Sequence, residues 1–351
     1  MNYFSKNIFA PLISFFVYLR GGKVGLKKFL HEQSDILIKN LPYNAEVIRF
    51  IYDWKKQHPN AKVYLISASY HDAVHDIAQF LNCFDGWFGT EDYNLKSEVK
   101  LKKIEELTHQ ETFTYIGDSV DDLVIWKNAE QCVLVNTSKR LTDKVLKINS
   151  LIEVIKDQDA NVFKEILKTI RVHQWAKNTL LFVPAVLALT TFFDSLVNLA
   201  LGFIAFSFIA SAFYILNDLF DIESDRNHHS KKNRSFASGS LSIFQGFGIF
   251  LCLILLAIQL ASNLSQSFQI CLLVYSISTF TYSKYLKKIP ILDIFTLSFL
   301  FQWRVITGGV LAGISVSNWL LTFSGFFFLF LAAVKRWIEL KQLKSNSIPG
   351  R

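Results

Sequence analysis

An acidic run, NDLFDIESD (217–225), offers the clearest chemistry in the chain. Asp218, Asp221 and Asp225 are three and four residues apart, so on an α-helix they would fall on one narrow face. Three carboxylates on one stripe repel each other unless a cation lies between them, and hard oxygen ligands suit Mg²⁺ that is shared with a substrate diphosphate. We predict that the three aspartates are catalytic metal ligands, with Asn217 as a supporting polar group. The alternative is a solvated acidic end of a helix.

Basic residues follow the acidic run and recur along the carboxyl-terminal half. Lys231, Lys232 and Arg234 stand in the segment after the run, Lys284 ends an apolar segment, and Arg304 lies inside another. An ionisable side chain in an apolar span is costly unless it faces a polar interior. These five cations are predicted to bind substrate phosphate groups. Alternatively, the lysines and arginines of the segment only set membrane topology, and Lys284 reaches back to the membrane surface.

The elements that must position these residues are apolar segments, which dominate the 351-residue chain from Thr179 onward. Such segments predict membrane-spanning helices, although several are shorter than the roughly 20 residues that a bilayer requires. Buried helices of a large soluble core are the alternative. We predict six spans, at Thr179–Phe193, Leu199–Leu216, Leu241–Ala261, Phe268–Tyr282, Ile289–Ala312 and Trp319–Val334.

Lys and Arg are distributed unevenly between the connections of these spans. The connections after spans two, four and six carry them (226–234, 284–288 and 335–344), whereas those after spans one, three and five carry none. By the positive-inside rule, the basic connections, the acidic run and the amino-terminal half are cytoplasmic, as in a multi-pass protein of a bacterial-type inner membrane. Anionic lipids account for the formal net charge of +8, so no nucleic-acid partner is expected.

The amino-terminal half alternates helical patterns with short β-rich runs, which predicts a parallel sheet flanked by helices. The expected strands are 63–69, 113–119 and 131–136. Polar residues end two of them, at the carboxyl edge where open α/β sheets bind ligands. The expected site residues are Ser67, Lys96, Asp118 and Asp122.

A strand-end serine, a lysine and an acidic pair, in this order, resemble the haloacid dehalogenase (HAD) superfamily. The resemblance implies that Ser67 in LISAS binds a phosphoryl oxygen, that Lys96 is a supporting cation, and that Asp118 and Asp122 in GDSVDD hold Mg²⁺. The nucleophilic DxDxT motif of that superfamily has no match before residue 45. Either the start of the chain is missing or this half has lost phosphatase activity.

The acidic run at the cytoplasmic end of the second span resembles the first aspartate-rich motif of the UbiA prenyltransferase superfamily. The resemblance implies a polytopic, all-helical membrane enzyme, usually of nine spans, that uses Mg²⁺ to hold a diphosphate beside an isoprenoid lipid. RVHQWAKN (171–178) and DRNHHSKKNR (225–234) resemble the branch that includes decaprenyl-phosphate phosphoribosyltransferase. The second aspartate-rich motif has no match before the sequence ends at Arg351, so we expect a fragment, truncated at both ends.

Together these patterns predict a Rossmann-like α/β domain (1–155), a linker and membrane entry (156–178), and a UbiA-like transmembrane helical bundle (179–351). The expected reaction is Mg²⁺-dependent transfer of phosphoribosyl from phosphoribosyl diphosphate (PRPP) to polyprenyl phosphate. Two alternatives stay open: transfer of a polyprenyl group from its diphosphate to an aromatic ring such as 4-hydroxybenzoate, and binding of lipid phosphate without catalysis.

Overall fold

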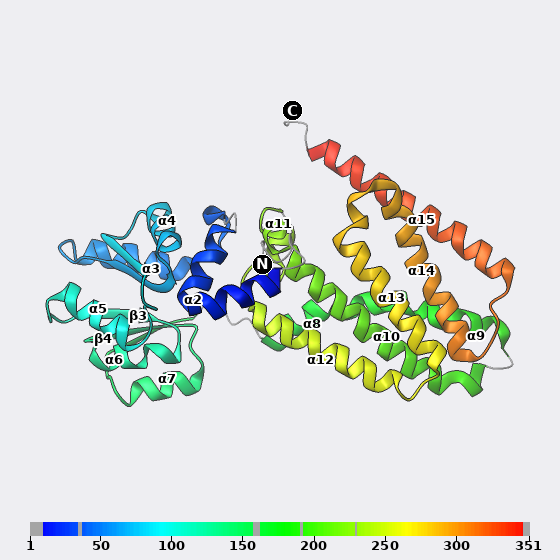
Figure 1. The fold of residues 1–351 in the computed structure, drawn as a ribbon, viewed down its shortest axis with the longest axis horizontal. Helices are drawn as coiled ribbons and strands as arrows, with labels where there is room; N and C mark the ends of the chain where they lie inside the picture. The colour runs from blue at the N-terminus through cyan, green and yellow to red at the C-terminus, as the bar shows by residue number, and fades with distance from the viewer. Residues whose placement is uncertain (1–9, 34–36, 157–161, 190–191, 229, 347–351) are drawn as a thin grey trace. The chain divides into compact units, whose positions relative to one another are not determined.

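The computed structural model describes residues 10–33, 37–156, 162–189, 192–228 and 230–346. Two compact units divide the chain: Met1–Asn161 with Glu223–Asn233, and Val162–Ile222 with Arg234–Arg351. The first combines helices and strands, whereas the second is helical (Figure 1). The division falls inside the predicted linker, of which residues 157–161 lie outside the described residues.

The first unit has an α/β architecture in which strands alternate with helices along the chain. Its elements are α2 (Ala10–Glu32), η1 (Ile38–Asn40), α3 (Ala45–Gln57), β1 (Tyr64–Tyr70), α4 (His71–Leu81), β2 (Gly86–Thr90), α5 (Glu98–Thr108), β3 (Thr114–Gly117), η2 (Val120–Asp122), α6 (Leu123–Asn128), β4 (Gln131–Val135), α7 (Lys139–Leu146) and β5 (Ile152–Ile155).

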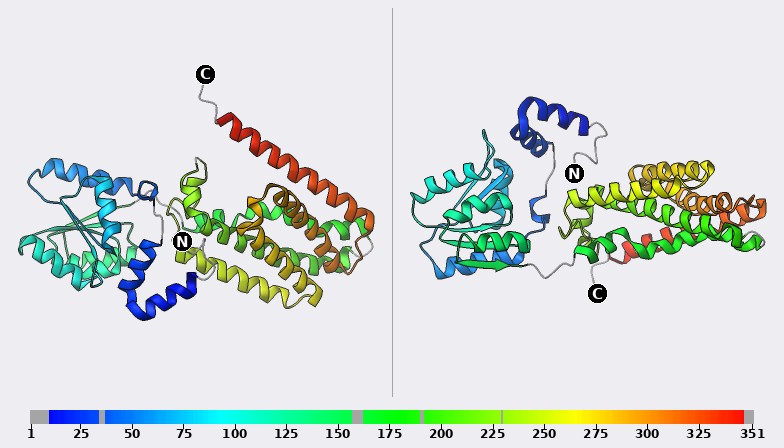
Figure 2. Two further views of the ribbon diagram at one scale, coloured as in Figure 1. Left: turned by 45° about the horizontal axis from the view of Figure 1, so that its top comes forward. Right: turned by 90° about the horizontal axis from the view of Figure 1, so that it is seen from below.

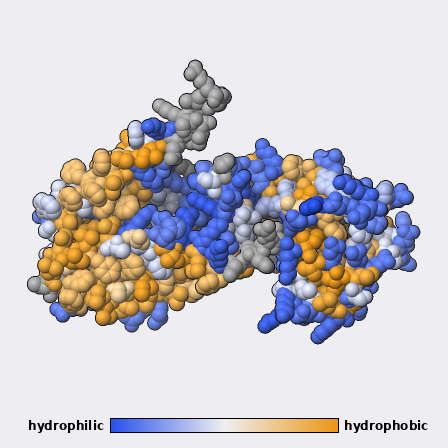
Figure 3. All heavy atoms as spheres, turned by 180° about the vertical axis from the view of Figure 1, so that it is seen from behind, coloured by the Kyte–Doolittle hydropathy of each residue, from blue (hydrophilic) through white to orange (hydrophobic). Residues whose placement is uncertain are grey.

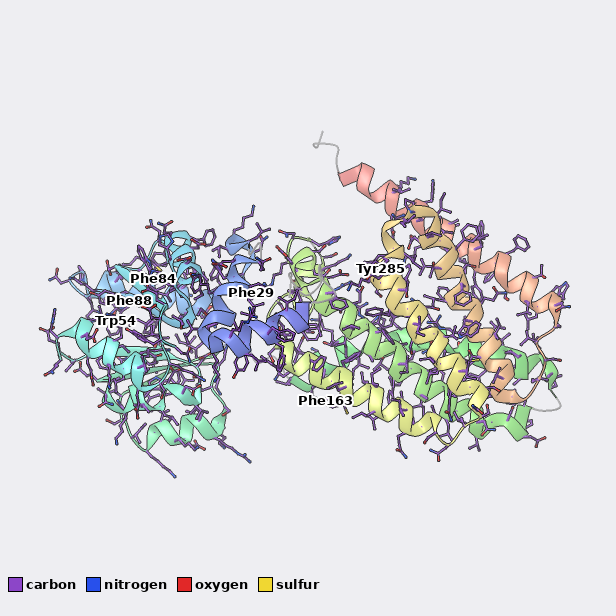
Figure 4. All side chains as sticks on the ribbon, in the orientation of Figure 1. Phe29, Trp54, Phe84, Phe88, Phe163 and Tyr285 are labelled. Atoms are coloured by element: carbon purple, nitrogen blue, oxygen red, sulfur yellow. The ribbon has the colours of Figure 1, made fainter. Side chains whose placement is uncertain are left out.

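All described strand pairs are parallel, in two sheets with the orders β1-β2 and β3-β4-β5. The three predicted strands are therefore confirmed as β1, β3 and β4, and β2 and β5 are additional. Trp126 and Leu134 are fully buried in a core beneath the three-stranded sheet. The ring of Phe88 on β2 lies 6.2 Å, centroid to centroid, from the ring of Tyr64 (Figure 4). The ammonium of Lys103 lies over the Phe88 ring.

The second unit consists of helices that pack as a bundle, with α10 and α12 side by side in both views of Figure 2. Its elements are α8 (Val162–Ile170), η3 (Val172–Phe182), α9 (Val183–Ala188), α10 (Phe192–Phe220), α12 (Ile243–Ala261), α13 (Gln266–Lys284), η5 (Leu286–Lys288), α14 (Pro290–Ala312) and α15 (Asn318–Asn346). Between α10 and α12 the chain forms α11 (Ile222–Arg226) and η4 (Lys231–Asn233).

Apolar side chains cover much of the outer surface of the bundle (Figure 3). On α12 and α15 they recur every three or four residues on one face of the helix, as expected for a surface that lipid covers. The exposed members of these two stripes are Phe244, Phe247, Leu251, Leu255 and Ile258, and Trp319, Phe323, Phe326 and Phe330. This unit is therefore an integral membrane domain.

Four helices in the described part of the chain are long and apolar enough to cross a membrane: Phe192–Phe220, Ile243–Ala261, Pro290–Ala312 and Asn318–Lys341. They match predicted spans two, three, five and six, and α13 occupies the position of span four. The prediction of one helix at Thr179–Phe193 is wrong, because η3 runs into the short α9 and then breaks at Leu189, whose φ is 44°. Residues 190–191 of that span lie outside the described residues.

Glycine allows α14 to approach η3 closely. A Cβ placed on Gly308 would lie 2.0 Å from the carbonyl oxygen of Leu181, far inside van der Waals contact. Small residues at such crossings are the usual means by which membrane helices pack backbone against neighbouring backbone. The contact fixes the position of η3, which carries several of the polar residues of the bundle interior.

Candidate functional site

The acidic run occupies the end of α10, but its three aspartates do not share one continuous helix. Asp218 lies in α10, which ends at Phe220, Asp221 stands at a bend, and Asp225 lies in α11. The prediction of a single helical stripe is therefore wrong, because the chain turns at Asp221 while keeping only the bond from its N–H to the carbonyl of Asn217 (2.9 Å).

Two arginines clamp Asp218, which is only 5% exposed. Nη2 of Arg171 donates to both carboxylate oxygens at 2.6 Å, and Nη1 of Arg234 donates to Oδ1 at 3.0 Å. The guanidinium of Arg171 also lies 5.1 Å from the ring centroid of Tyr214. Arg171 adopts left-handed backbone angles (φ 56°, ψ 48°), a strained conformation for an arginine that is often found at functional sites.

Asp221 and Asn217 share a third cation. Nζ of Lys287 donates to Oδ2 of Asp221 at 2.7 Å and to Oδ1 of Asn217 at 3.1 Å. Lys287 lies in η5, in the connection from α13 to α14, so its contact ties that connection to the end of α10. Two carboxylates, one amide and three cations thus meet at one end of the bundle; we call Asn217, Asp218, Asp221, Arg171, Arg234 and Lys287 the charged cluster.

Four other residues predicted for this site, Asp225, Lys231, Lys232 and Lys284, have no described contact with the charged cluster. Asp225, which is 3% exposed, and the exposed Lys231 and Lys232 belong to the segment that groups with the first unit. Lys284 lies over the ring of Tyr285 at the end of α13 (Figure 4), and none of its described contacts reaches the aspartates. The metal role of the three aspartates stays a prediction.

The oxygen donors of the charged cluster suit a divalent cation that a substrate helps to hold. Mg²⁺ typically takes one or two carboxylates and completes its shell with water and phosphate oxygens, which matches Asp218, Asp221 and the amide of Asn217. Among the described residues, no group of three His, Cys, Asp or Glu side chains could hold a metal ion alone. The protein's own cations instead neutralise the two carboxylates.

Arg304 is buried in the middle of α14 (4% exposed), and its described hydrogen bonds all go to neutral groups. Its Nε donates to Oδ1 of Asn178 and its Nη2 to the hydroxyl of Tyr275, at 2.9 Å each, while Nη1 donates to the carbonyl of Leu300. Asn178 in turn donates to Ser207 at 2.9 Å. The predicted polar interior is therefore present around Arg304.

In the first unit, Asp122 is the centre of a hydrogen-bond network at the end of β3. Its carboxylate accepts from the hydroxyl of Tyr115 at 2.7 Å, from the N–H and hydroxyl of Ser119 at 3.1 and 3.0 Å, and from Lys100 at 3.4 Å. Burial opposes ionisation, but these donors outweigh it and lower the pKa of Asp122. The exposed Asp118 has its pKa raised, by partial desolvation and by the charge of Asp122.

The predicted cation of this site, Lys96, pairs with Asp121 at 2.8 Å, and Lys100, one helical turn further on, contacts Asp122 instead. Ser67 lies within β1, which runs on to Tyr70 in the other sheet, so its predicted position at the end of the strand is wrong, and no described contact joins it to Asp122. Lys27 of α2 donates to the carbonyl of Ala68, beside Ser67. The phosphate-binding role of these residues stays a prediction.

Replacing Asp122 by Asn should destabilise the first unit by about 3 kcal/mol, because it removes one charge of a nearly buried pair. Since the folded pKa of Asp122 lies below its unfolded value of about 3.9, its contribution is complete above that pH and is lost as pH falls below it. Hydrogen exchange of residues 114–128 at pH 7 measures the loss, and thermal unfolding between pH 3 and 7 should show wild type and variant converging in acid.

The adjacent Asp121 provides the control, because it is exposed and pairs only with the exposed Lys96. Its change to Asn should alter stability by less than about 1 kcal/mol. If residues 114–128 were equally protected from hydrogen exchange in the wild type and in Asp122→Asn, the hydrogen-bond network of Asp122 would not be a source of stability.

Sequence reasoning missed four basic residues that contact the predicted sites: Arg171 at Asp218, Lys287 at Asp221, Lys100 at Asp122 and Lys27 beside Ser67. Arg171 and Lys287 lie 47 and 66 residues from the aspartates that they contact, and both occur in basic connections that topology alone explains. RVHQWAKN, the motif that opens with Arg171, was the available signal.

Comparison with known proteins finds similarity over the helical unit. Residues 179–346 match the UbiA prenyltransferase family. Uncharacterized protein y4nM of Sinorhizobium fredii is 35% identical over 337 residues, which cover 94% of this chain and 64% of that protein. Decaprenyl-phosphate phosphoribosyltransferase of Corynebacterium glutamicum is 35% identical over 185 residues (51% of this chain, 56% of that protein). Nodulation protein NoeC of Azorhizobium caulinodans is 36% identical over 181 residues (51% and 58%).

The chain spans between 56% and 64% of the length of these three relatives. The similarity to y4nM extends over both units, because it covers nearly the whole of this chain, whereas each of the other two covers about half. The combination of an α/β unit with a helical membrane unit is therefore shared with y4nM.

Proposed function

We propose that the chain is part of an intramembrane transferase of the UbiA prenyltransferase family, which moves phosphoribosyl from PRPP to polyprenyl phosphate; the match of residues 179–346 to that family supports the class of enzyme. The observation that carries the proposal is the charged cluster, in which three cations already gather at one end of the bundle. Relatives named decaprenyl-phosphate phosphoribosyltransferase support the choice of donor and acceptor.

The proposed step breaks the bond between ribose C1 and the diphosphate oxygen and forms a bond from C1 to a phosphate oxygen of the lipid. Negative charge grows on the departing diphosphate, and positive charge develops at C1. Arg171, Arg234 and Lys287 would bind the diphosphate oxygens and offset the growing charge. Their present partners, Asp218 and Asp221, hold these cations in place before the substrate arrives.

In this proposal, Asp218, Asp221 and Asn217 would hold Mg²⁺, which would supply Lewis-acid stabilisation of the leaving diphosphate. Arg171, Arg234 and Lys287 would bind the phosphate oxygens, so that every charge of the cluster has a partner of opposite sign. This matters most for Asp218, because an unpaired buried charge is costly.

For the first unit we propose a HAD-like, phosphatase-type role on the cytoplasmic side, removing the phosphate of the lipid-linked sugar phosphate. The hydroxyl of Ser67, the carboxylates of Asp118 and Asp122 after β3, and the cations Lys27, Lys96 and Lys100 support binding of a phosphate group and its metal ion. The described residues include no DxDxT nucleophile motif, so another residue or another part of the protein would have to supply the attacking group.

One experiment tests both parts. Protein in lipid nanodiscs is given labelled PRPP with polyprenyl phosphate, or labelled polyprenyl diphosphate with 4-hydroxybenzoate, each with Mg²⁺ and with EDTA. We expect a labelled lipid from PRPP alone, lost with EDTA, and slow release of phosphate from that lipid. Product from the second pair only would establish aromatic prenyl transfer instead. Lipid phosphate that binds without product from either pair would establish a binding protein.

A further inference from the structure

Two cations of the helical unit, the buried Arg304 and the exposed Lys177, have no acidic partner among the described residues. Arg304 contacts Asn178, Tyr275 and a carbonyl, all of them neutral. Lys177, in η3, has no hydrogen bond or ion pair among the described residues and lies 5.9 Å from the ring centroid of Phe301. Arg304 lies 5.3 Å from the same ring centroid, so both positive charges gather around one aromatic side chain.

Free donors remain on both side chains. A guanidinium has five N–H groups, of which Arg304 uses three in its described bonds, and an ammonium has three, of which Lys177 uses none. Lys177 is exposed, and the charged groups that act on it are Arg304, Lys335 and Arg171. Of these neighbours, Lys335 has Glu339 within 3.7 Å and Arg171 has Asp218.

An ionisable group inside a membrane protein is costly unless it serves a ligand or a charge pathway. The charged cluster differs from this pair, because its cations are matched by carboxylates and suit a substrate that brings Mg²⁺. Unmatched cations suit an anion that arrives without a metal. We therefore propose that Lys177 and Arg304 form a second anion site, which binds a phosphate monoester.

This inference rests on the proposed function for its choice of ligand, because both proposed substrates carry such a group. PRPP carries one at the far end of its ribose, and the lipid carries one at its head. Lys177 follows Arg171 by six residues of 3₁₀ helix, about 12 Å at about 2 Å per residue, so the two sites lie within reach of one bound assembly of substrates.

The test uses Lys177→Gln in the protein in nanodiscs, with Lys177→Arg as the conservative variant. Lys341→Gln is the matched control, since Lys341 also lies over an aromatic ring, 5.2 Å from Trp337, but on α15. We expect Lys177→Gln to raise the KM for one substrate by about tenfold, as for one lost charge-assisted hydrogen bond, with the other KM within about twofold. Lys177→Arg should keep that KM near the wild-type value, and Lys341→Gln should leave both KM values unchanged.

A higher KM for PRPP would assign the site to PRPP, and a higher KM for polyprenyl phosphate would assign it to the lipid. Binding of ribose 5-phosphate and of farnesyl phosphate, measured by calorimetry, reads the site without turnover. If neither donor reacts, a Lys177-dependent affinity for one of these probes still supports the site while the proposed function fails. If both KM values or neither of them change, and neither probe depends on Lys177, the pair is structural and the inference is overturned.

Discussion

Replacement of Asp218 by Asn is expected to reduce phosphoribosyl transfer by about 10³-fold, because it removes the charge that holds two cations of the charged cluster. Arg171 and Arg234 both donate to this carboxylate, which is 5% exposed, so the substitution removes the negative charge that offsets both guanidiniums. The rate of label transfer from PRPP to polyprenyl phosphate in nanodiscs measures the effect.

Asp194 gives a matched control on the same helix. It lies in the first turn of α10, at the end opposite Asp218, and is exposed. Asp194→Asn should therefore keep the wild-type rate. A variant at Asp218 that unfolds at the wild-type temperature and still transfers at more than a tenth of the wild-type rate would remove this residue from the proposed mechanism.

Replacement of Gly308 by Ala should destabilise the helical unit by about 3 kcal/mol, at the upper end of the cost of overpacking. The new Cβ would meet the carbonyl group of Leu181 at 2.0 Å, and a backbone atom cannot rotate away as a side chain does. Either α14 or η3 must shift, and a shift of η3 moves both Arg171 and Asn178. We expect a lower unfolding temperature and weaker transfer activity.

Gly248 on α12 serves as the comparison, since a Cβ there would meet nothing within 4 Å. Gly248→Ala should leave stability unchanged or raise it by up to about 1 kcal/mol, the usual helix preference for alanine. Should both alanine variants unfold at the wild-type temperature, α14 and η3 would not pack as closely as the structure has them.

Hydropathy located most of the helical unit because each long helix exposes an apolar stripe. It failed at Thr179–Phe193, where the apolar residues form a 3₁₀ segment and a short helix instead of one long helix. Apolar composition predicts removal from water but does not fix the backbone conformation. In the first unit, GWFGT (β2) was missed because two glycines in five residues weaken a strand pattern.

The acidic half of the charged cluster was visible in the sequence, whereas the basic half was not. Asp218 and Asp221 stand together in one run, and local spacing is enough to single them out. Their partners Arg171 and Lys287 come close only through packing of η3 and η5 against α10. The choice between Lys96, which precedes α5, and Lys100, which lies in its first turn, likewise depends on how α5 packs, which spacing alone does not determine.

The length of α10 has a consequence for the fate of the products. Its 29 residues, at about 1.5 Å each, measure about 43 Å, which exceeds a hydrocarbon core of roughly 30 Å. Centred in a bilayer, the helix carries its last turn, with Asp218, to the level of the lipid headgroups. In the proposed reaction, diphosphate released there would pass into water without a channel, while the lipid product would stay in the bilayer. Partition into two phases would then separate the products and disfavour the reverse reaction.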